Sequence, residues 1–287
     1  MQQRPTSVHR PSHALVLAGG GVTGIAWEIG MLAGLWDAGI DLTSADLIVG
    51  TSAGAAVAAQ IASGVPMSEL LAKQQAVDTS ELSIDFDLES YRAATAALLE
   101  TATDVVDACI RRGRMAVEAD VVPEPVRRAV IAARLPVHTW PDRKLVITAV
   151  DVVLGTLVVF DRDSGVPLVD AVAASCAVPG IWPPVTVGPH RYMDGVCRSS
   201  TNADLAAGYD RVVVLIPIGH TEFQKAQLRD ELSTLGADAV SHVVYANADS
   251  LGAIGSNPLD ASRRPAAAHA GQMQAKSVAD DLVRVWA

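Results

Sequence analysis

The segment "HALVLAGGGVTGIAWEIG" at residues 13–30 places three consecutive glycines between two apolar stretches. Residues 14–18 form a short apolar run that predicts a buried strand, and residues 24–38 predict a helix that ends at Gly39. The glycines therefore make a strand-to-helix turn, where bare backbone N–H groups can converge on negative charge. Two kinds of site use this geometry: a phosphate cradle for a nucleotide and an oxyanion hole for acyl transfer.

The same strand-turn-helix order recurs in "DLIVGTSAGAAVAAQIASG" at residues 46–64. Residues 47–49 predict a strand and residues 53–61 an alanine-rich helix. Two such units near the start of the chain imply a sheet covered by helices. The runs "KLVITAVDVV" and "RVVVLIPIG" predict later strands, so we expect an α/β fold.

Length and composition bound the organisation of the chain. At 287 residues and 50% hydrophobic content, the chain can bury a sizeable core. Because no long linker divides the sequence, we expect a single domain over residues 13–287, preceded by a flexible segment at 1–12. Residues 66–135 change to helical character and are expected to form a helical insertion. Such an insertion serves as a lid or substrate wall, or it only covers one face of the sheet.

The charge balance restricts the partners. The chain has 22 basic and 32 acidic residues, for a formal net charge of −10, and it has no block of Lys and Arg. We therefore expect no nucleic-acid partner. The same negative charge argues against electrostatic docking on anionic lipid. Transient contact of an apolar patch with a membrane surface remains as an alternative.

The cysteines and the apolar runs bear on the compartment. Cys109, Cys176 and Cys197 are an odd count without metal-binding or redox spacing, so we interpret them as buried thiols of a reducing compartment. The apolar run at 14–18 is shorter than the roughly 7–15 residues of a signal core, and no run reaches the roughly 18 residues of a membrane span. These features predict a cytoplasmic protein.

The stretch "GTSAG" at residues 50–54 fits the pattern G-x-S-x-G of a nucleophile elbow. It stands after a predicted strand and before a predicted helix, as that pattern requires. The turn is so tight that side chains beside the serine would clash, which explains Gly50 and Gly54. Ser52 would then project at a helix N-terminus, whose dipole favours developing negative charge.

A dinucleotide site is the alternative use of the glycine-rich turn, because Gly19, Gly21 and Gly24 satisfy G-x-G-x-x-G. That site needs an acidic side chain at the end of the second strand to hold a ribose. Here the second strand ends at Gly50, and the nearest aspartates precede it. The sequence thus offers a nucleophile where a nucleotide enzyme would offer a carboxylate, and we expect no nucleotide cofactor.

Four ordered motifs together resemble the patatin-like phospholipase family over residues 15 to about 218. They are "GGGVTG" at 19–24, "GTSAG" at 50–54, "ASCAVPGIWPPV" at 174–185 and "DGV" at 194–196. The resemblance implies a three-layer α/β/α sandwich with a central, mostly parallel sheet. It also implies a serine–aspartate dyad that hydrolyses acyl esters of lipids without a metal or cofactor.

The site residues carried over by the resemblance are few. The family's nucleophile matches Ser52, its dyad aspartate matches Asp194, and its oxyanion glycines match Gly19, Gly20 and Gly21. On this interpretation Ser52 attacks the ester carbonyl, Asp194 accepts its proton, and water later releases the acyl-enzyme. An aspartate near its reference pKa of about 3.9 is a weak base, so burial is expected to raise that pKa.

Two positions depart from the family pattern. Thr23 stands where members carry Arg or Lys, so the chain lacks a cation that would favour a phosphate head group or strengthen the oxyanion site. Val196 replaces the usual Gly or Ala after the Asp-Gly pair, which itself is intact. Trp182, in the proline-rich motif, is expected either to contact an acyl chain or to give structural support alone.

Other interpretations remain for the same residues. Asp194 before glycine also fits an ordinary turn. The order Ser52, Asp194, then His220, His242 or His269 permits an α/β-hydrolase triad, with histidine as the base. Thr23 is compatible with a lipid-binding or partner-binding module that has lost turnover. None of the histidines has metal-ligand spacing, so no metal is expected.

Overall fold

Eight strands form one sheet in the computed structural model, which describes residues 12–76, 81–82 and 84–286. Hydrogen-bonded neighbours follow the order β5-β6-β3-β2-β1-β7-β8, and β4 pairs with β3. The parallel strands are β1 (His13–Leu17), β2 (Leu47–Gly50), β3 (Lys144–Asp151), β7 (Arg211–Ile216) and β8 (Val240–Tyr245). The antiparallel strands are β4 (Leu157–Phe160), β5 (Val185–Val187) and β6 (His190–Asp194). Of the expected flexible segment at 1–12, residues 1–11 lie outside the described residues.

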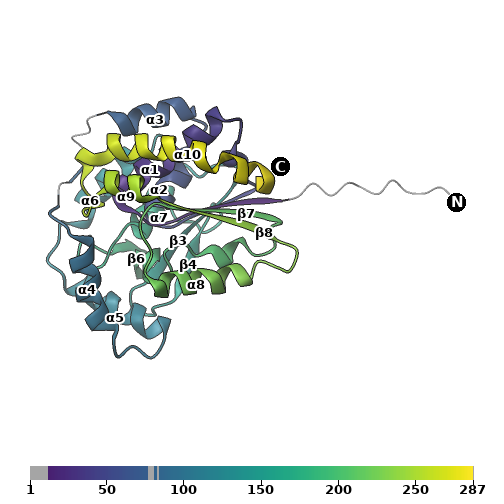
Figure 1. Cartoon of the computed structure of the whole chain (residues 1–287). Coiled ribbons are helices and arrows are strands. Elements are labelled where there is room, and N and C mark those ends of the chain that lie inside the picture. The colour runs from purple at the N-terminus through teal and green to yellow at the C-terminus, as the bar shows by residue number, and fades with distance from the viewer. Residues whose placement is uncertain (1–11, 77–80, 83, 287) are drawn as a thin grey trace.

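The sheet is the middle layer of a three-layer α/β/α sandwich, as Figure 1 shows. Successive side chains of a strand point to opposite faces of the sheet, so β1 contributes side chains to two hydrophobic cores. Leu15 and Leu17 face one helical layer, whereas Ala14 and Val16 face the other. The first layer holds α1 (Gly21–Asp37), α2 (Ala53–Ile61), α7 (Leu168–Ser175), α9 (Ala248–Ile254) and α10 (Arg264–Trp286), and the second holds α8 (Glu222–Ser233). The α/β/α expectation is confirmed.

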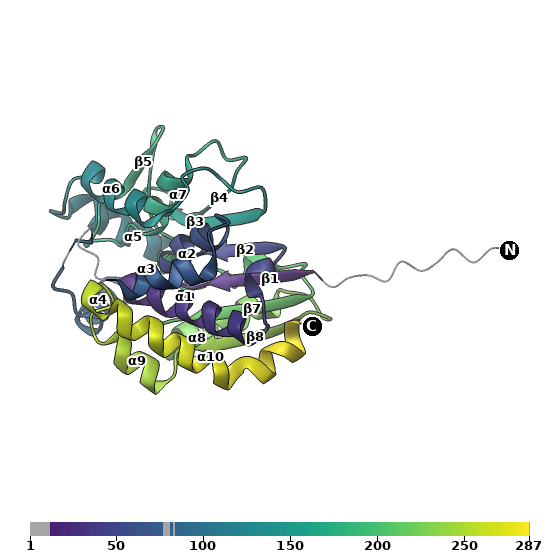
Figure 2. The same ribbon diagram turned by 90° about the horizontal axis from the view of Figure 1, so that it is seen from above.

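Helices α1 and α10 lie side by side along the first layer (Figure 2). Small residues allow their backbones to approach closely. A Cβ added at Gly30 would lie 2.0 Å from the Ala268 carbonyl oxygen, and one at Gly271 would lie 2.2 Å from that of Trp27. The final helix therefore packs on α1 as well as on the sheet. In this helix Arg264 is buried, and its Nη2 donates to the Lys73 carbonyl oxygen.

Strand β3 brings the ends of β2 and β6 together. Ile147 and Ala149 each pair with β4 along one edge of β3. Along the other edge, Ile147 pairs with Gly50, the last residue of β2, and Ala149 pairs with Asp194, the last residue of β6. Because β2 runs parallel and β6 antiparallel to β3, their carboxyl ends meet opposite Thr148. Residues far apart in sequence thus become neighbours.

Four helices occupy the segment between α2 and β3: α3 (Met67–Gln75), α4 (Leu88–Leu99), α5 (Val105–Glu118) and α6 (Glu124–Arg134). Helices α4 and α5 lie beyond the carboxyl ends of the parallel strands, at the opposite end of the sheet from the chain's C-terminus (Figure 1). Ligands of open α/β sheets bind at that end. No helix in the described ranges is both long and apolar enough to cross a bilayer.

The predicted elements match the structure with local differences. Helix α1 begins at Gly21 and ends at Asp37, so its first turn includes the last glycine of the run. Strands β5 and β8 and helices α8 and α9 were not predicted from the sequence. Short 3-10 helices complete the chain at η1 (Leu42–Ser44), η2 (Gly195–Cys197), η3 (Ala203–Ala206) and η4 (Ala261–Arg263).

Candidate active site

Ser52 occupies a sharp turn between β2 and α2. Its backbone adopts φ 55° and ψ −114°, a conformation that costs a non-glycine residue free energy and is common at functional sites. Gly54 permits the turn, because a Cβ there would lie 2.0 Å from the Leu17 carbonyl oxygen. At Gly50 a Cβ would lie 2.6 Å from the Ala55 Cα atom. The two glycines of the motif are therefore required by close backbone packing.

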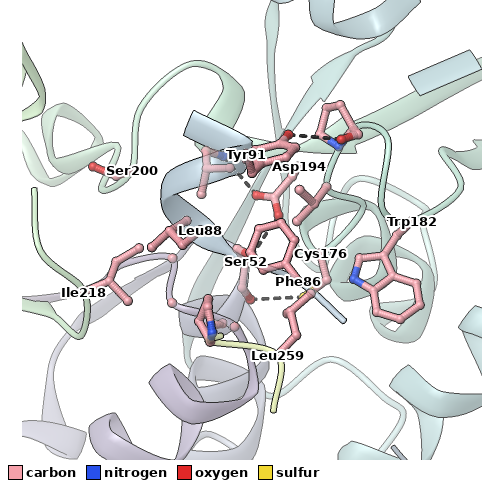
Figure 3. Close-up of a pocket in the computed structure, with 18 of the residues that line it drawn as sticks. Ser52, Phe86, Leu88, Tyr91, Cys176, Trp182, Asp194, Ser200, Ile218 and Leu259 are labelled. Atoms are coloured by element: carbon pink, nitrogen blue, oxygen red, sulfur yellow. Dashed lines mark hydrogen bonds between the residues drawn. The ribbon is translucent and has the colours of Figure 1, made fainter. Parts of the chain in front are cut away.

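Ser52 and Asp194 are in direct contact (Figure 3). The Ser52 hydroxyl donates to Asp194 Oδ2 over 2.7 Å, and the Val196 N–H donates to Asp194 Oδ1 over 3.0 Å. Asp194 is fully buried. Burial raises the pKa of its carboxyl group to about 7, despite the opposing effect of those two hydrogen bonds. A carboxyl group with that pKa can accept a proton near neutral pH.

The backbone of Ser52 is held from α7 and the residue after it. The Ser52 N–H donates to Ser175 Oγ over 2.9 Å, and the Cys176 thiol donates to the Ser52 carbonyl oxygen over 3.2 Å. Ser175 is fully buried. Ser175 and Cys176, at the start of the proline-rich motif, therefore hold the backbone of Ser52. This contact was not predicted from the sequence.

A buried hydroxyl and amide network supports the site from below. Thr51 Oγ1 lies 2.9 Å from Thr148 Oγ1, at the point where β2 and β6 meet. Asn202 has a left-handed backbone with φ 51°, and its Nδ2 donates to Thr51 Oγ1 over 3.1 Å and to the Ser199 carbonyl oxygen over 2.9 Å. No sequence pattern singled out Asn202, because its partners lie on three separate segments.

The glycine-rich turn faces Ser52 from the start of α1. The Gly19 N–H donates to the Ser200 carbonyl oxygen over 3.0 Å. Within the described chain, the N–H groups of Gly20 and Gly21 have no hydrogen-bond partner, and both glycines line the same cavity as Ser52. A Cβ at Gly20 would lie 2.3 Å from Pro217 Cγ, so only glycine fits there. Two free donors beside Ser52 can receive an oxyanion.

Thr23 has a structural role. Its N–H and its hydroxyl both donate to the Pro258 carbonyl oxygen, over 3.1 and 3.2 Å. The side chain is fully buried and does not line the cavity. The segment that holds Pro258 therefore closes over the glycine-rich turn, and Leu259 beside it forms part of the cavity wall.

The cavity at Ser52 has a volume of about 200 Å³ and mixes apolar and cationic walls. Apolar lining residues include Val22, Ile25, Phe86, Leu88, Trp182, Ile218 and Leu259, several of which are labelled in Figure 3. Tyr91 also lines it and donates from its hydroxyl to the Pro179 carbonyl oxygen over 3.0 Å. Such a cavity suits a ligand with an apolar chain and a polar group. In the described residues, no three His, Cys, Asp or Glu side chains cluster as metal ligands would.

The triad alternative requires a histidine near Ser52 and Asp194. His220, His242 and His269 are absent from the described residues that line the cavity. His220 packs edge-on against Tyr245, and burial lowers the pKa of its imidazole to about 4. All three cysteines are free and buried, so the expectation that they are buried is confirmed.

Comparisons with known proteins complete the description of the site. The sequence model described as "Patatin-like phospholipase" matches residues 15–207. No curated protein matches the chain. Among solved structures, VipD from Legionella pneumophila is similar at 14% identity and a TM-score of 0.48, over 95% of this chain and 67% of VipD.

Two solved structures of the type III effector ExoU are also similar, each at 18% identity. One covers 93% of this chain and 53% of ExoU, with a TM-score of 0.38. The other, full-length ExoU with SpcU from the type III secretion system of Pseudomonas aeruginosa, covers 97% and 53%, with a TM-score of 0.41. This chain thus spans about half the length of ExoU.

Proposed function

Because the chain belongs to the patatin-like phospholipase family, we propose that it is a lipid acyl hydrolase that cleaves carboxylic esters through Ser52 and Asp194. The observation that carries this proposal is the 2.7 Å hydrogen bond from the Ser52 hydroxyl to a buried carboxylate. Serine is a poor nucleophile until a base removes its proton, and this contact supplies the base without a third residue. The triad alternative lacks such support, since no histidine from the alternative lines the cavity.

In the acylation step, Ser52 Oγ attacks the ester carbonyl carbon while Asp194 accepts the hydroxyl proton. The Val196 N–H keeps the carboxylate oriented, because it holds the oxygen that does not face Ser52. The raised pKa near 7 makes Asp194 a stronger base than a solvated aspartate. The same proton then passes to the departing alcohol oxygen, and an acyl-serine remains.

The negative charge that develops on the carbonyl oxygen needs donors. We assign this role to the N–H groups of Gly20 and Gly21, which have no other partner in the described structure. Gly19 instead contributes by its bond to the Ser200 carbonyl oxygen, which fixes the start of the turn. The N-terminus of α1 adds a favourable dipole at the same place.

Hydrolysis of the acyl-serine repeats the chemistry with water as the nucleophile. Asp194 accepts a proton from the water, and the same N–H groups stabilise the oxyanion that forms. The fatty acid leaves as Ser52 regains its proton. The steps as written need neither a metal nor an organic cofactor. The proposed substrates are lipid esters, which the protein reaches by transient contact with a membrane surface. The proposed compartment is the cytoplasm, where the three thiols stay reduced.

An active-site phosphonate probe tests the proposal. We expect the wild-type protein to be labelled covalently, Ser52→Ala to take up no probe, and Ser164→Ala to be labelled as the wild type is. Ser164 is an exposed turn serine, so it controls for loss of a hydroxyl elsewhere. Equal labelling of Ser52→Ala would refute the assignment, and a folded wild type that takes up no probe would favour the binding-module alternative.

A further inference from the structure

The cavity at Ser52 is cationic in an acidic protein. Four arginines line it, Arg92, Arg112, Arg127 and Arg134, against one carboxyl group, Asp194, among the described lining residues. The whole chain carries a formal charge of −10. All four arginines come from helices α4, α5 and α6, so the segment between α2 and β3 supplies the positive charge.

Three of these arginines have partners within the protein. Arg92 and Arg112 donate to backbone carbonyl oxygens over 2.6 and 2.9 Å, and Arg134 forms a 2.7 Å ion pair with Glu81. Arg127 differs. It is only 4% exposed, and its Nε and Nη1 are buried without a hydrogen-bond partner in the described part of the chain.

The surroundings of Arg127 fix the guanidinium in place. It lies over the ring of Trp182, with its central carbon 3.7 Å from the ring centroid. The ring contacts the flat face of the guanidinium, so the ring does not occupy the N–H groups at the guanidinium edge. Burial lowers the pKa of Arg127 to about 9, so the side chain stays charged at neutral pH. A buried charge with unsatisfied donors is costly, and an anionic ligand would remove that cost.

We propose that Arg127 forms an anion-binding subsite of the catalytic cavity, and that the preferred substrates are acyl esters with a phosphate or carboxylate group beside the scissile ester. This inference rests on the proposed hydrolase activity. The substrate's anionic oxygens accept from the guanidinium group of Arg127, which lines the cavity, while its acyl chain lies on the apolar wall. The cation missing at position 23 is thus supplied from α6.

A second role for Arg127 must be separated from this one. The positive charge of Arg127 lowers the pKa of Asp194. Loss of that charge would raise the pKa, so less of the Asp194 carboxyl group would be ionised. That effect would reduce the hydrolysis of every ester equally. An anion subsite acts only on substrates that carry the charge, so comparing neutral and anionic esters at one pH separates the two effects.

The experiment compares three esters with one acyl chain: 1-oleoylglycerol, 1-oleoylglycerol 3-phosphate and 3-oleoylglycerate. They place no charge, a phosphate or a carboxylate beside the ester. We expect the wild type to show a kcat/KM at least about tenfold higher on an anionic ester than on the neutral one. The two anionic arms identify which group is recognised.

The variants are Arg127→Gln and Arg127→Lys, with Arg128→Gln as the matched control on the same helix. Arg128 pairs with Asp170 and does not line the cavity. Arg127→Gln should lower kcat/KM on the anionic ester by about 10–100-fold and change the neutral ester by less than about threefold. Arg127→Lys should recover part of the loss, because it keeps the charge without the planar fork. Arg128→Gln should leave the ratio of the two rates unchanged.

A binding measurement separates this inference from the proposed function. In a Ser52→Ala background, we expect 1-oleoylglycerol 3-phosphate or 3-oleoylglycerate to bind at least about tenfold tighter than 1-oleoylglycerol, and Arg127→Gln to remove the difference. If Arg127→Gln does not fold, Arg127→Lys and the wild-type preference decide. Equal rates and equal binding for neutral and anionic esters, or a loss that Arg127 variants show on all three alike, would overturn the subsite. Failure of Ser52-dependent turnover with retained anion binding would refute only the hydrolase.

Discussion

The sheet and the segment between α2 and β3 contribute to the same cavity in different ways. All nine residues of α2, directly after the nucleophile, are buried, whereas only Thr95 of the twelve residues of α4 is buried. The sheet presents Ser52 and Asp194 at strand ends, where backbone hydrogen bonds and close glycine packing fix them. The segment between α2 and β3 presents long arginine side chains and apolar residues from more exposed elements.

This difference suggests that the two jobs of the site are separable. Reaction geometry must be held to fractions of an ångström, and buried strand ends provide that precision. Recognition of a substrate tolerates more movement, so it can be built on helices with fewer buried residues. Changes in the sheet should therefore affect turnover of every ester, and changes in the helices should affect the choice among esters.

The largest effect is expected from Asp194→Asn. The amide keeps the shape of the side chain but cannot take the Ser52 proton as a carboxylate does, so kcat should fall by about 10²–10⁴-fold on all esters. His220→Ala, His242→Ala and His269→Ala should each stay within about tenfold of the wild type. Steady-state kinetics on variants with cooperative melting would check this. A folded histidine variant that loses about 10³-fold would overturn the dyad and restore the triad.

The next effect is the pH dependence of turnover. Asp194 acts as a base only when ionised, and burial raises its pKa to about 7. We therefore expect kcat/KM to be constant above that pH and to fall about tenfold for each unit below it. The profile should have the same shape for short and long acyl chains. A rate that stays level down to pH 5 would mean that another group takes the proton.

A smaller effect is expected from the segment between α2 and β3. Leu88→Ala and Phe86→Ala remove apolar surface from the cavity wall. Each should lower kcat/KM for a long-chain ester by about 3–30-fold while an acetyl ester changes by less than about twofold. The exposed Leu251→Ala, outside the cavity, is the control. An equal loss on both esters would show that this segment has a structural role alone.

The smallest effect concerns stability. The carboxyl group of Asp194 has a higher pKa in the folded than in the unfolded chain, so the unfolded chain binds fewer protons between about pH 4 and 7. Stability from this group is therefore present at low pH and is lost as pH rises through about 7. Asp194→Asn should raise Tm by at least about 2 °C at pH 8 and much less at pH 4.5. A lower Tm for the variant at pH 8 would contradict the inference that burying the ionised carboxylate of Asp194 destabilises the folded chain.

The sequence predicted the parts of the site that rest on local rules. Both strand-turn-helix units, with Gly50, Ser52 and Gly54, could be recognised because a tight turn restricts which residues fit within a few positions. Asp194 came from the resemblance rather than from its own residues, since an Asp-Gly pair fits many turns. Its contact with Ser52 depends on β3, which pairs with both β2 and β6.

The remainder depended on contacts between distant segments. The Asn202 network joins three segments, and no spacing in the sequence encodes it. Arg127 lies in a helix whose amphipathic pattern predicts only that one face is covered; that the guanidinium reaches Trp182 and the cavity follows from tertiary packing. Strand β8 was missed because polar residues interrupt its apolar ones and half of its positions are exposed.

The bonds from Thr23 to Pro258 set an order of assembly. The ribosome makes the glycine-rich turn before Pro258, which accepts the hydrogen bonds of Thr23, and before α10, which packs on α1 through Gly30 and Gly271. A growing chain thus carries Ser52 before the contacts that hold the glycine-rich turn can form. We expect chains stopped at residue 255, which lack Pro258 and α10, to take up no phosphonate probe; labelling of such chains would contradict this order of assembly.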